Sequence, residues 1–264
     1  MSETAKFCPR CGAPLPQTVT VGAPSTGLIP DAPDRTQPAV PWRAREAIAV
    51  FLIHILITAI MVVPIALLVS GDDMLTAAGI MISELVLLVT LAAWIKIRYG
   101  LGFRALGFRG LSGANVAIGL GAGVGGLLVA GIVSQIIAQI VESITGSPPG
   151  DPEQIPLETD APQGALLVII AVSVIVLAPL AEEAFFRGFV YPSLRRWARA
   201  WPAILLSAAI FSITHVIPIV LLPIFALGMV LAWLVERRRS LVPAVVAHMA
   251  FNGFGFWVLY IASR

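Results

Sequence analysis

Seven apolar stretches constrain this chain more than any other feature. They lie near residues 47–69, 74–95, 113–141, 164–194, 202–217, 219–236 and 241–262. A helix needs roughly 20 apolar residues to cross the hydrocarbon core of a bilayer. Of the 264 residues, 58% are hydrophobic and only 12% are charged, against about 25% charged residues in a soluble domain. We therefore expect an all-α integral membrane protein, a polytopic bundle of about seven transmembrane helices.

The few charged residues are distributed unevenly between the loops. Basic loops, such as 96–109 and 237–239, alternate with acidic or neutral loops, such as 142–163. By the positive-inside rule, this pattern predicts a multi-pass protein of the cell membrane with a cytoplasmic N-terminus. The formal net charge is only +2 and the basic residues are scattered, so we expect no nucleic-acid partner.

Residues 1–42 form a polar head, and residues 43–264 form the membrane domain. No long apolar run follows Met1, so no signal peptide is expected. Cys8 and Cys11 stand in Cys-Pro-Arg-Cys-Gly, the shape of one zinc knuckle. A structural zinc site takes four ligands. The pair is therefore either a half site completed by another chain, for example a second copy in a homo-oligomer, or a degenerate remnant or plain reduced pair. Residues 13–42 are typical of a Pro-rich flexible tether.

Residues 121–126 match the pattern G-x-G-x-x-G within an apolar stretch. A dinucleotide-binding fingerprint requires a preceding strand and the start of a helix, and neither is expected here. Gly119 with Gly123, and Gly121 with Gly125, are small-xxx-small pairs that let transmembrane helices approach closely. The glycines are therefore interpreted as helix-packing positions.

Ionisable residues inside the apolar stretches are the candidate functional residues. Each one costs about 2.5–3.5 kcal/mol at a helix centre on insertion scales. Glu182, Glu183 and Arg187 lie in the fourth stretch, His215 in the fifth, and His248 with Asn252 in the last; His54 and Glu84 are isolated in the first two. Glu183 and Arg187 have the spacing of a helical ion pair. Glu182 points about 100° away from Glu183 and is therefore free for chemistry.

At a rise of about 1.5 Å per residue, Glu182, His215 and His248 lie roughly 14–21 Å from the cytoplasmic surface. They are therefore expected to meet at one level. A carboxylate and two imidazoles in a cavity suit general-base catalysis on a water molecule, and they could also coordinate a divalent metal such as zinc. The alternative is that these polar groups hold the helices together.

Three motifs resemble those of the CAAX-protease and bacteriocin-processing family of intramembrane proteases. Residues 182–187 (EEAFFR) are similar to its E-E-x-x-x-R, residues 211–215 (FSITH) to its F-x-x-x-H, and residues 248–252 (HMAFN) to its H-x-x-x-N. They occur in family order, and the resemblance covers about residues 100–262, including two Leu-Gly-Phe-Arg segments at 101–104 and 106–109. It implies an endopeptidase that acts on a membrane-associated protein or peptide.

The resemblance also implies roles for the candidate catalytic residues. Glu182 and His215 would activate the attacking water, and His248 with Asn252 would donate hydrogen bonds to the oxyanion. Glu183 and Arg187 would orient the site. A metal at Glu182, His215 and His248 stays open, because the family is commonly labelled metalloprotease whereas no H-E-x-x-H occurs here.

Neither the substrate nor the activity is fixed by the resemblance. Eukaryotic members trim prenylated CAAX proteins, and bacterial relatives are linked to bacteriocin maturation or self-immunity. Two other classes of function remain: a catalytically idle scaffold or immunity protein, and a proton-coupled transporter that uses Glu84, Glu182 and the histidines. Transporters often show repeated halves, which this sequence lacks.

Overall fold

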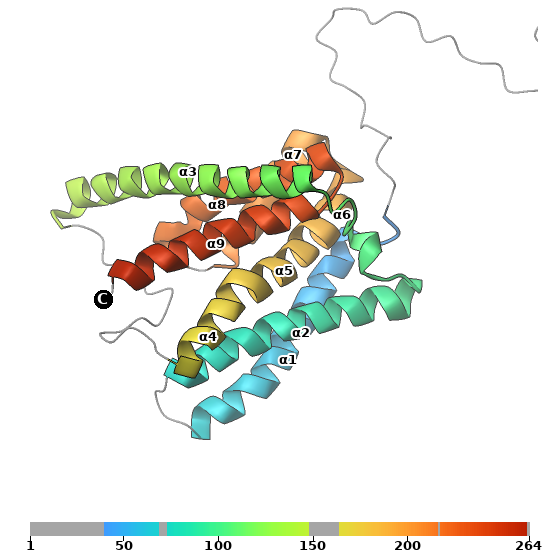
Figure 1. Cartoon of the computed structure of the whole chain (residues 1–264). Coiled ribbons are helices and arrows are strands. Elements are labelled where there is room, and N and C mark those ends of the chain that lie inside the picture. The colour runs from blue at the N-terminus through green and yellow to red at the C-terminus, as the bar shows by residue number, and fades with distance from the viewer. Residues whose placement is uncertain (1–39, 69–72, 148–163, 216, 263–264) are drawn as a thin grey trace, which may run out of the picture. The chain divides into compact units, whose positions relative to one another are not determined.

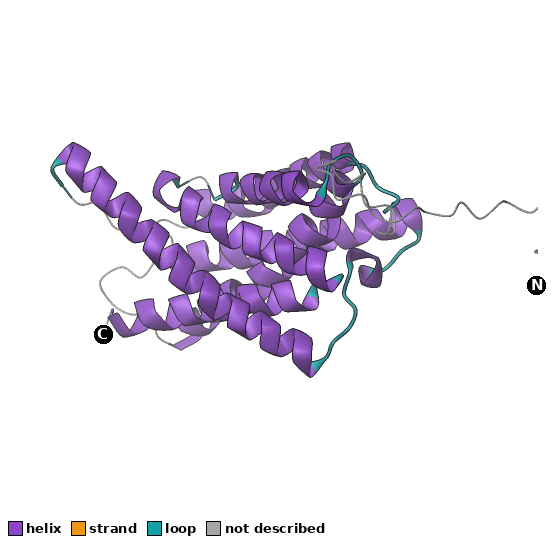
Figure 2. Ribbon diagram, turned by 90° about the horizontal axis from the view of Figure 1, so that it is seen from above, coloured by secondary structure: helices purple, strands orange, loops and turns teal. Residues whose placement is uncertain are grey.

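The computed structural model describes residues 40–68, 73–147, 164–215 and 217–262. Within these residues the secondary structure is helical throughout, without strands (Figures 1 and 2). The α-helices are α1 (Ala44–Leu68), α2 (Asp73–Tyr99), α3 (Gly113–Thr145), α4 (Gly164–Val172), α5 (Ala178–Glu182), α6 (Tyr191–Arg195), α7 (Ala200–Ile213), α8 (Pro218–Arg238) and α9 (Val242–Ala262). The expected all-α polytopic architecture is confirmed.

The described residues contain seven apolar helical stretches, where the sequence predicted them. Five are long and apolar enough to cross a bilayer: 44–67, 75–99, 113–145, 164–195 and 218–238. The apolar helices 200–213 and 242–258 are shorter. At about 1.5 Å per residue, α7 extends only about 21 Å, less than the roughly 30 Å of a hydrocarbon core. By length alone, α7 is therefore too short to cross the hydrocarbon core before the turn that carries His215.

The fourth stretch is one continuous helical rod with two π-helical segments. One is η2 (Ser173–Leu177) and the other is η3 (Glu183–Val190). In each, a backbone N–H bonds five residues back: Ala178 to the Ser173 carbonyl, and Tyr191 to the Phe186 carbonyl. Such π-turns are rare and occur often at functional sites. Every residue of η3 is buried, so this segment is the centre of the bundle.

Close packing of α3 on α9 depends on glycine (Figure 1). A Cβ atom at Gly123 would stand 2.5 Å from the Ala247 carbonyl oxygen, and one at Gly119 would stand 2.7 Å from Val246 Cβ. A Cβ at Gly121 or Gly125 would meet nothing within 4 Å. One of the two expected glycine pairs therefore packs against a helix, and the other faces open space.

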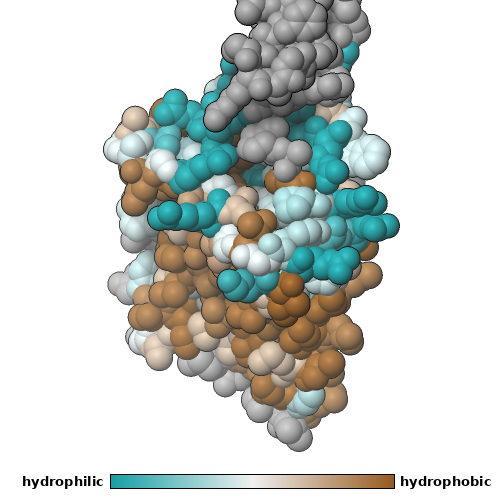
Figure 3. Space-filling view, turned by 90° about the vertical axis from the view of Figure 1, so that its right-hand side faces the viewer, coloured by the Kyte–Doolittle hydropathy of each residue, from teal (hydrophilic) through white to brown (hydrophobic). Residues whose placement is uncertain are grey.

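The exposed surface is unlike that of a soluble protein. Large apolar side chains are exposed along α1, α2 and α3, for example Leu67 at 82% and Leu128 at 65%. Figure 3 shows one face on which hydrophobic residues cover the lower part and hydrophilic residues gather above them. A broad apolar belt beside a polar end fits a lipid-embedded body.

The N-terminal head cannot be compared with its prediction. Residues 1–39, including Cys8 and Cys11, lie outside the described residues. The zinc half site, a tether over residues 13–39 and a homo-oligomer formed through the head remain predictions.

Candidate active site

Glu183 and Arg187 form the ion pair that their spacing predicted. Arg187 Nη1 donates to Glu183 Oε1 at 2.8 Å, and both side chains are completely buried. Arg187 Nη2 donates to the Gly228 carbonyl at 3.2 Å, which ties the rod to α8. The guanidinium carbon also lies 4.1 Å from the centroid of the Phe211 ring, a cation–π contact. A buried arginine is tolerated here because a carboxylate, a carbonyl and an aromatic face surround it.

His248 of α9 lies between the two glutamates. Its Nδ1 is 3.1 Å from Glu183 Oε1, and its Nε2 is 3.8 Å from Glu182 Oε2. The prediction that Glu182 faces away from the Glu183 pair is therefore wrong in one respect, because one imidazole contacts both carboxylates. The physical reason is the size of the ring: an imidazole is wide enough to bridge side chains about 100° apart on one helix.

Glu182 and Glu183 differ in access. The Glu182 side chain keeps 17% of its surface exposed, whereas Glu183 keeps none. Glu183 Oε1 is occupied by Arg187 and His248. Of the two carboxylates, Glu182 is thus the one that a water molecule or substrate can reach.

His215 is held at the end of the short helix α7. Its Nδ1 lies 3.0 Å from the Phe211 carbonyl, so the ring donates Nδ1–H and leaves Nε2 as an acceptor. The Phe211 ring is packed edge-on against both His215 and His248, with centroids 4.9 and 5.8 Å apart. Ser212 donates to the Leu221 carbonyl and fixes the turn to α8. The second motif thus brings His215 beside the first and third motifs.

Asn252 contacts the backbone of the rod. Its Nδ2 donates to the Val174 carbonyl at 2.8 Å. In a regular helix that carbonyl would accept from Ala178, but Ala178 bonds Ser173 instead, and Pro179 has no N–H to offer. Asn252 therefore donates a hydrogen bond to a carbonyl that has no partner within its own helix, because of the π-turn and the proline. This hydrogen bond links α9 to the rod one helical turn beyond His248.

Glu84 joins this neighbourhood, although its sequence position gave no sign of it. Its carboxyl group is close enough to Glu182 for the two charges to interact. Glu84 Oε2 is buried and has no hydrogen-bond partner among the described residues. His54, by contrast, is buried and pairs with Thr58 of its own helix, with 3.4 Å between Nδ1 and the hydroxyl oxygen.

The geometry does not favour a metal centre. Within the described residues, no three His, Cys, Asp or Glu side chains are arranged to hold one metal ion. His248 directs both ring nitrogens at glutamates, and His215 directs Nδ1 at a carbonyl. Glu182, His215 and His248 thus do not fit one metal ion in this arrangement.

Two contacts outside the motifs support the rod. Trp42 is fully buried, stacks on Phe189 with centroids 4.9 Å apart, and donates its indole N–H to the Phe189 carbonyl at 2.9 Å. Leu106, in the second Leu-Gly-Phe-Arg segment, packs so closely on Gly188 that a Cβ there would approach within 2.9 Å. Trp42, which was predicted to lie in a flexible tether, instead packs against the rod. An aromatic residue just before an apolar stretch was the available signal.

Together, the fold and this cluster define a polytopic helical membrane protein with a buried Glu–Arg–His site. Residues 164–254 match the Rce1-like family model, type II CAAX prenyl endopeptidase Rce1-like. The matched segment contains all three motifs and confirms the family resemblance predicted from them. It is shorter than the predicted extent of about 100–262, and both Leu-Gly-Phe-Arg segments lie outside it. No curated protein and no solved structure matches the chain.

Proposed function

We propose that the chain is an intramembrane endopeptidase that hydrolyses a peptide bond of a membrane-associated protein or peptide. The observation that supports this most is the linked cluster of Glu182, His248, Glu183 and Arg187 inside the segment with the Rce1-like match. Holding helices together needs neither two adjacent glutamates on one imidazole nor an accessible carboxylate within the bundle.

Glu182 acts as the general base in this proposal. It takes a proton from a water molecule, whose oxygen attacks the carbonyl carbon of the scissile bond. Collapse of the tetrahedral intermediate breaks the C–N bond, and the proton passes to the leaving amine. His215, with Nε2 free to accept, assists in the proton transfer.

His248 stabilises the oxyanion through Nε2, which faces Glu182 rather than Glu183. Its Nδ1–H is held by the Glu183 carboxylate, and the ring donates from Nε2 when both of its nitrogens carry a proton. Glu183 and Arg187 are positioning residues, since both are completely buried. Asn252 has one N–H committed to the Val174 carbonyl, so it positions His248 and has a second N–H with which to assist at the oxyanion.

In this proposal the N-terminus is cytoplasmic and the chain is a multi-pass protein of the cell membrane, as the charge pattern predicts. The substrate class is any peptide that presents its scissile bond to Glu182 from the membrane. A prenylated CAAX protein, which the family description names, is one such substrate.

The test is comparative membrane peptidomics of cells that produce the wild type or the Glu182→Gln variant. The Glu142→Gln variant is the control, because Glu142 is exposed at the end of α3. We expect at least one peptide terminus that is present with wild type and Glu142→Gln and absent with Glu182→Gln. An identical set of termini in all three, with normal protein levels, would favour the scaffold over the protease.

A further inference from the structure

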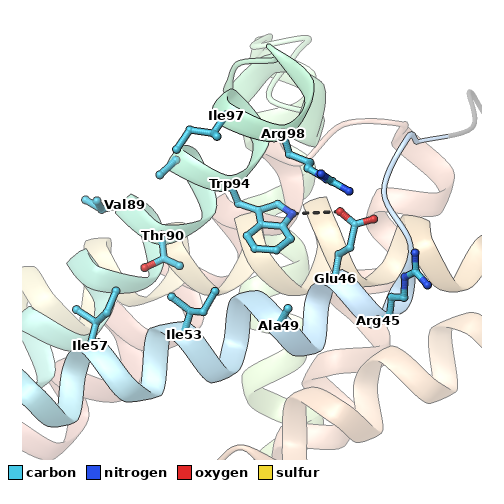
Figure 4. Close-up of a pocket in the computed structure, with 11 residues that line it drawn as sticks. Arg45, Glu46, Ala49, Ile53, Ile57, Val89, Thr90, Trp94, Ile97 and Arg98 are labelled. Atoms are coloured by element: carbon cyan, nitrogen blue, oxygen red, sulfur yellow. Dashed lines mark hydrogen bonds between the residues drawn. The ribbon is translucent and has the colours of Figure 1, made fainter.

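A groove between α1 and α2 lies apart from the residues of the proposed reaction. Its cavity volume is about 790 Å³, within the range of roughly 300–1,000 Å³ common for ligand sites. None of its lining residues belongs to the three motifs. The lining divides into a charged end and an apolar length (Figure 4).

Two guanidinium groups mark the charged end. Arg45 stands in the first turn of α1 and Arg98 in the last turn of α2, so the antiparallel helices bring them to the same end of the groove. Both side chains are exposed. Glu46 lies between them in Figure 4.

The Glu46 carboxylate is already used within the protein. It accepts hydrogen bonds from Trp94 Nε1 at 3.2 Å, from the Tyr99 hydroxyl and from the Arg43 amide at 3.1 Å. These three hydrogen bonds stabilise the negative charge of the Glu46 carboxylate and hold the side chain in position. Two guanidinium groups against one carboxylate leave this end of the groove with a net positive charge.

The rest of the groove is apolar and runs away from the arginines. Ile53, Ile57 and Val89 line it, with 38%, 37% and 65% of their surface exposed. Measured along the helices, the distance from Arg45 to Ile57 is about 18 Å, and from Arg98 to Val89 about 14 Å. These lengths match one leaflet, half of the roughly 30 Å hydrocarbon core.

We propose that this groove binds one anionic phospholipid. The headgroup phosphate lies between Arg45 and Arg98, and one acyl chain follows the apolar lining between α1 and α2. Arginine binds phosphate in a bidentate manner, and basic pockets between transmembrane helices are suited to anionic headgroups. A neutral isoprenoid or an apolar peptide segment would fill the apolar part but leave the net positive charge of this end uncompensated.

Lipid binding to the purified, delipidated full chain in detergent tests this proposal, with native mass spectrometry as the readout. The probes are phosphatidylglycerol and phosphatidylcholine with identical acyl chains. Near a membrane surface each arginine contributes about fivefold in affinity for an anionic lipid. We therefore expect the Arg45→Gln/Arg98→Gln variant to bind phosphatidylglycerol about 25-fold more weakly, with phosphatidylcholine binding unchanged.

Two further variants distinguish lipid binding in the groove from an effect of the overall charge of the protein. Arg104→Gln/Arg199→Gln removes the same charge from two exposed arginines outside the groove and should bind as the wild type does. Ala93→Phe fills the apolar part and should abolish phosphatidylglycerol binding while both arginines remain. Glu182→Gln should also bind normally, so this proposal and the proposed function can fail separately.

Four results would overturn the lipid site. The first is equal loss of binding in the two arginine pairs, which would indicate overall charge. The second is undiminished binding in Ala93→Phe, which would indicate a surface contact with the headgroup alone. The third is equal affinity of the wild type for both lipids, which would show that the headgroup charge is not recognised. The fourth is a co-purifying isoprenoid or peptide that Ala93→Phe displaces, which would assign the groove to another occupant.

Discussion

Replacing Glu183 by alanine is expected to destabilise the helix bundle strongly. Glu183 Oε1 is shared by Arg187 at 2.8 Å and His248 at 3.1 Å, and both members of the ion pair are completely buried. Removing one partner of a buried pair costs about 3–5 kcal/mol, because the other charge stays buried without compensation. Arg187 would keep the Gly228 carbonyl and the Phe211 ring, so we expect the lower half of that range.

Glu182→Ala is the matched control for this substitution. Its nearest ionic contact is 3.8 Å, to His248, and its side chain is 17% exposed. Its removal should therefore change the free energy of unfolding by less than about 1 kcal/mol. The two adjacent glutamates are thus expected to differ in their effects: Glu183 stabilises the bundle, whereas Glu182 is required for cleavage.

The assay is reversible unfolding in lipid bicelles, followed by a double-mutant cycle. In the Glu183→Ala/Arg187→Met variant the uncompensated cation is gone, so the loss should be smaller than the sum of the two single losses by about 2 kcal/mol or more. Additive losses would refute the ion-pair reasoning. Equal destabilisation by Glu182→Ala and Glu183→Ala would refute it as well.

Two further predictions concern packing around the site. Gly123→Ala should destabilise the bundle by about 1–3 kcal/mol, since its Cβ would stand 2.5 Å from the Ala247 carbonyl oxygen. Gly121→Ala should leave the free energy of unfolding unchanged, because a Cβ there meets nothing within 4 Å. Equal free energies of unfolding in the two variants would contradict the α3–α9 contact. Trp42→Phe keeps an aromatic ring on Phe189 but loses the 2.9 Å hydrogen bond to its carbonyl. It should cost about 1–3 kcal/mol in the same assay, and an unchanged free energy of unfolding would show that Trp42 does not hold the rod.

Much of the fold followed from local sequence, because a membrane-embedded helix must satisfy its own backbone. Apolar runs and loop charges were therefore enough to place the helices. The Glu183–Arg187 pair was also predictable, since i, i+4 geometry is a property of one helix. The helical rise predicted that Glu182, His215 and His248 lie at one level, and the resemblance to a family joined the three motifs.

The remaining features depend on tertiary contacts that one helix cannot encode. Glu84 approaches Glu182 only because α2 packs on the rod. The hydrogen bond from Asn252 to Val174 requires a π-turn, which helical periodicity does not predict. The groove between α1 and α2 has a charged end only because the antiparallel packing brings Arg45 and Arg98 to one side.

The central claim is that Glu182 activates water for peptide hydrolysis. The most direct measurement is the cleavage rate of a peptide identified by the peptidomic comparison, with purified wild type and Glu182→Gln reconstituted in liposomes at equal protein levels. General-base catalysis contributes typically 10²–10⁴-fold, so we predict a loss of that size with unchanged stability. A Glu182→Gln rate within about threefold of the wild type, far short of the typical contribution of a general base, would contradict the account.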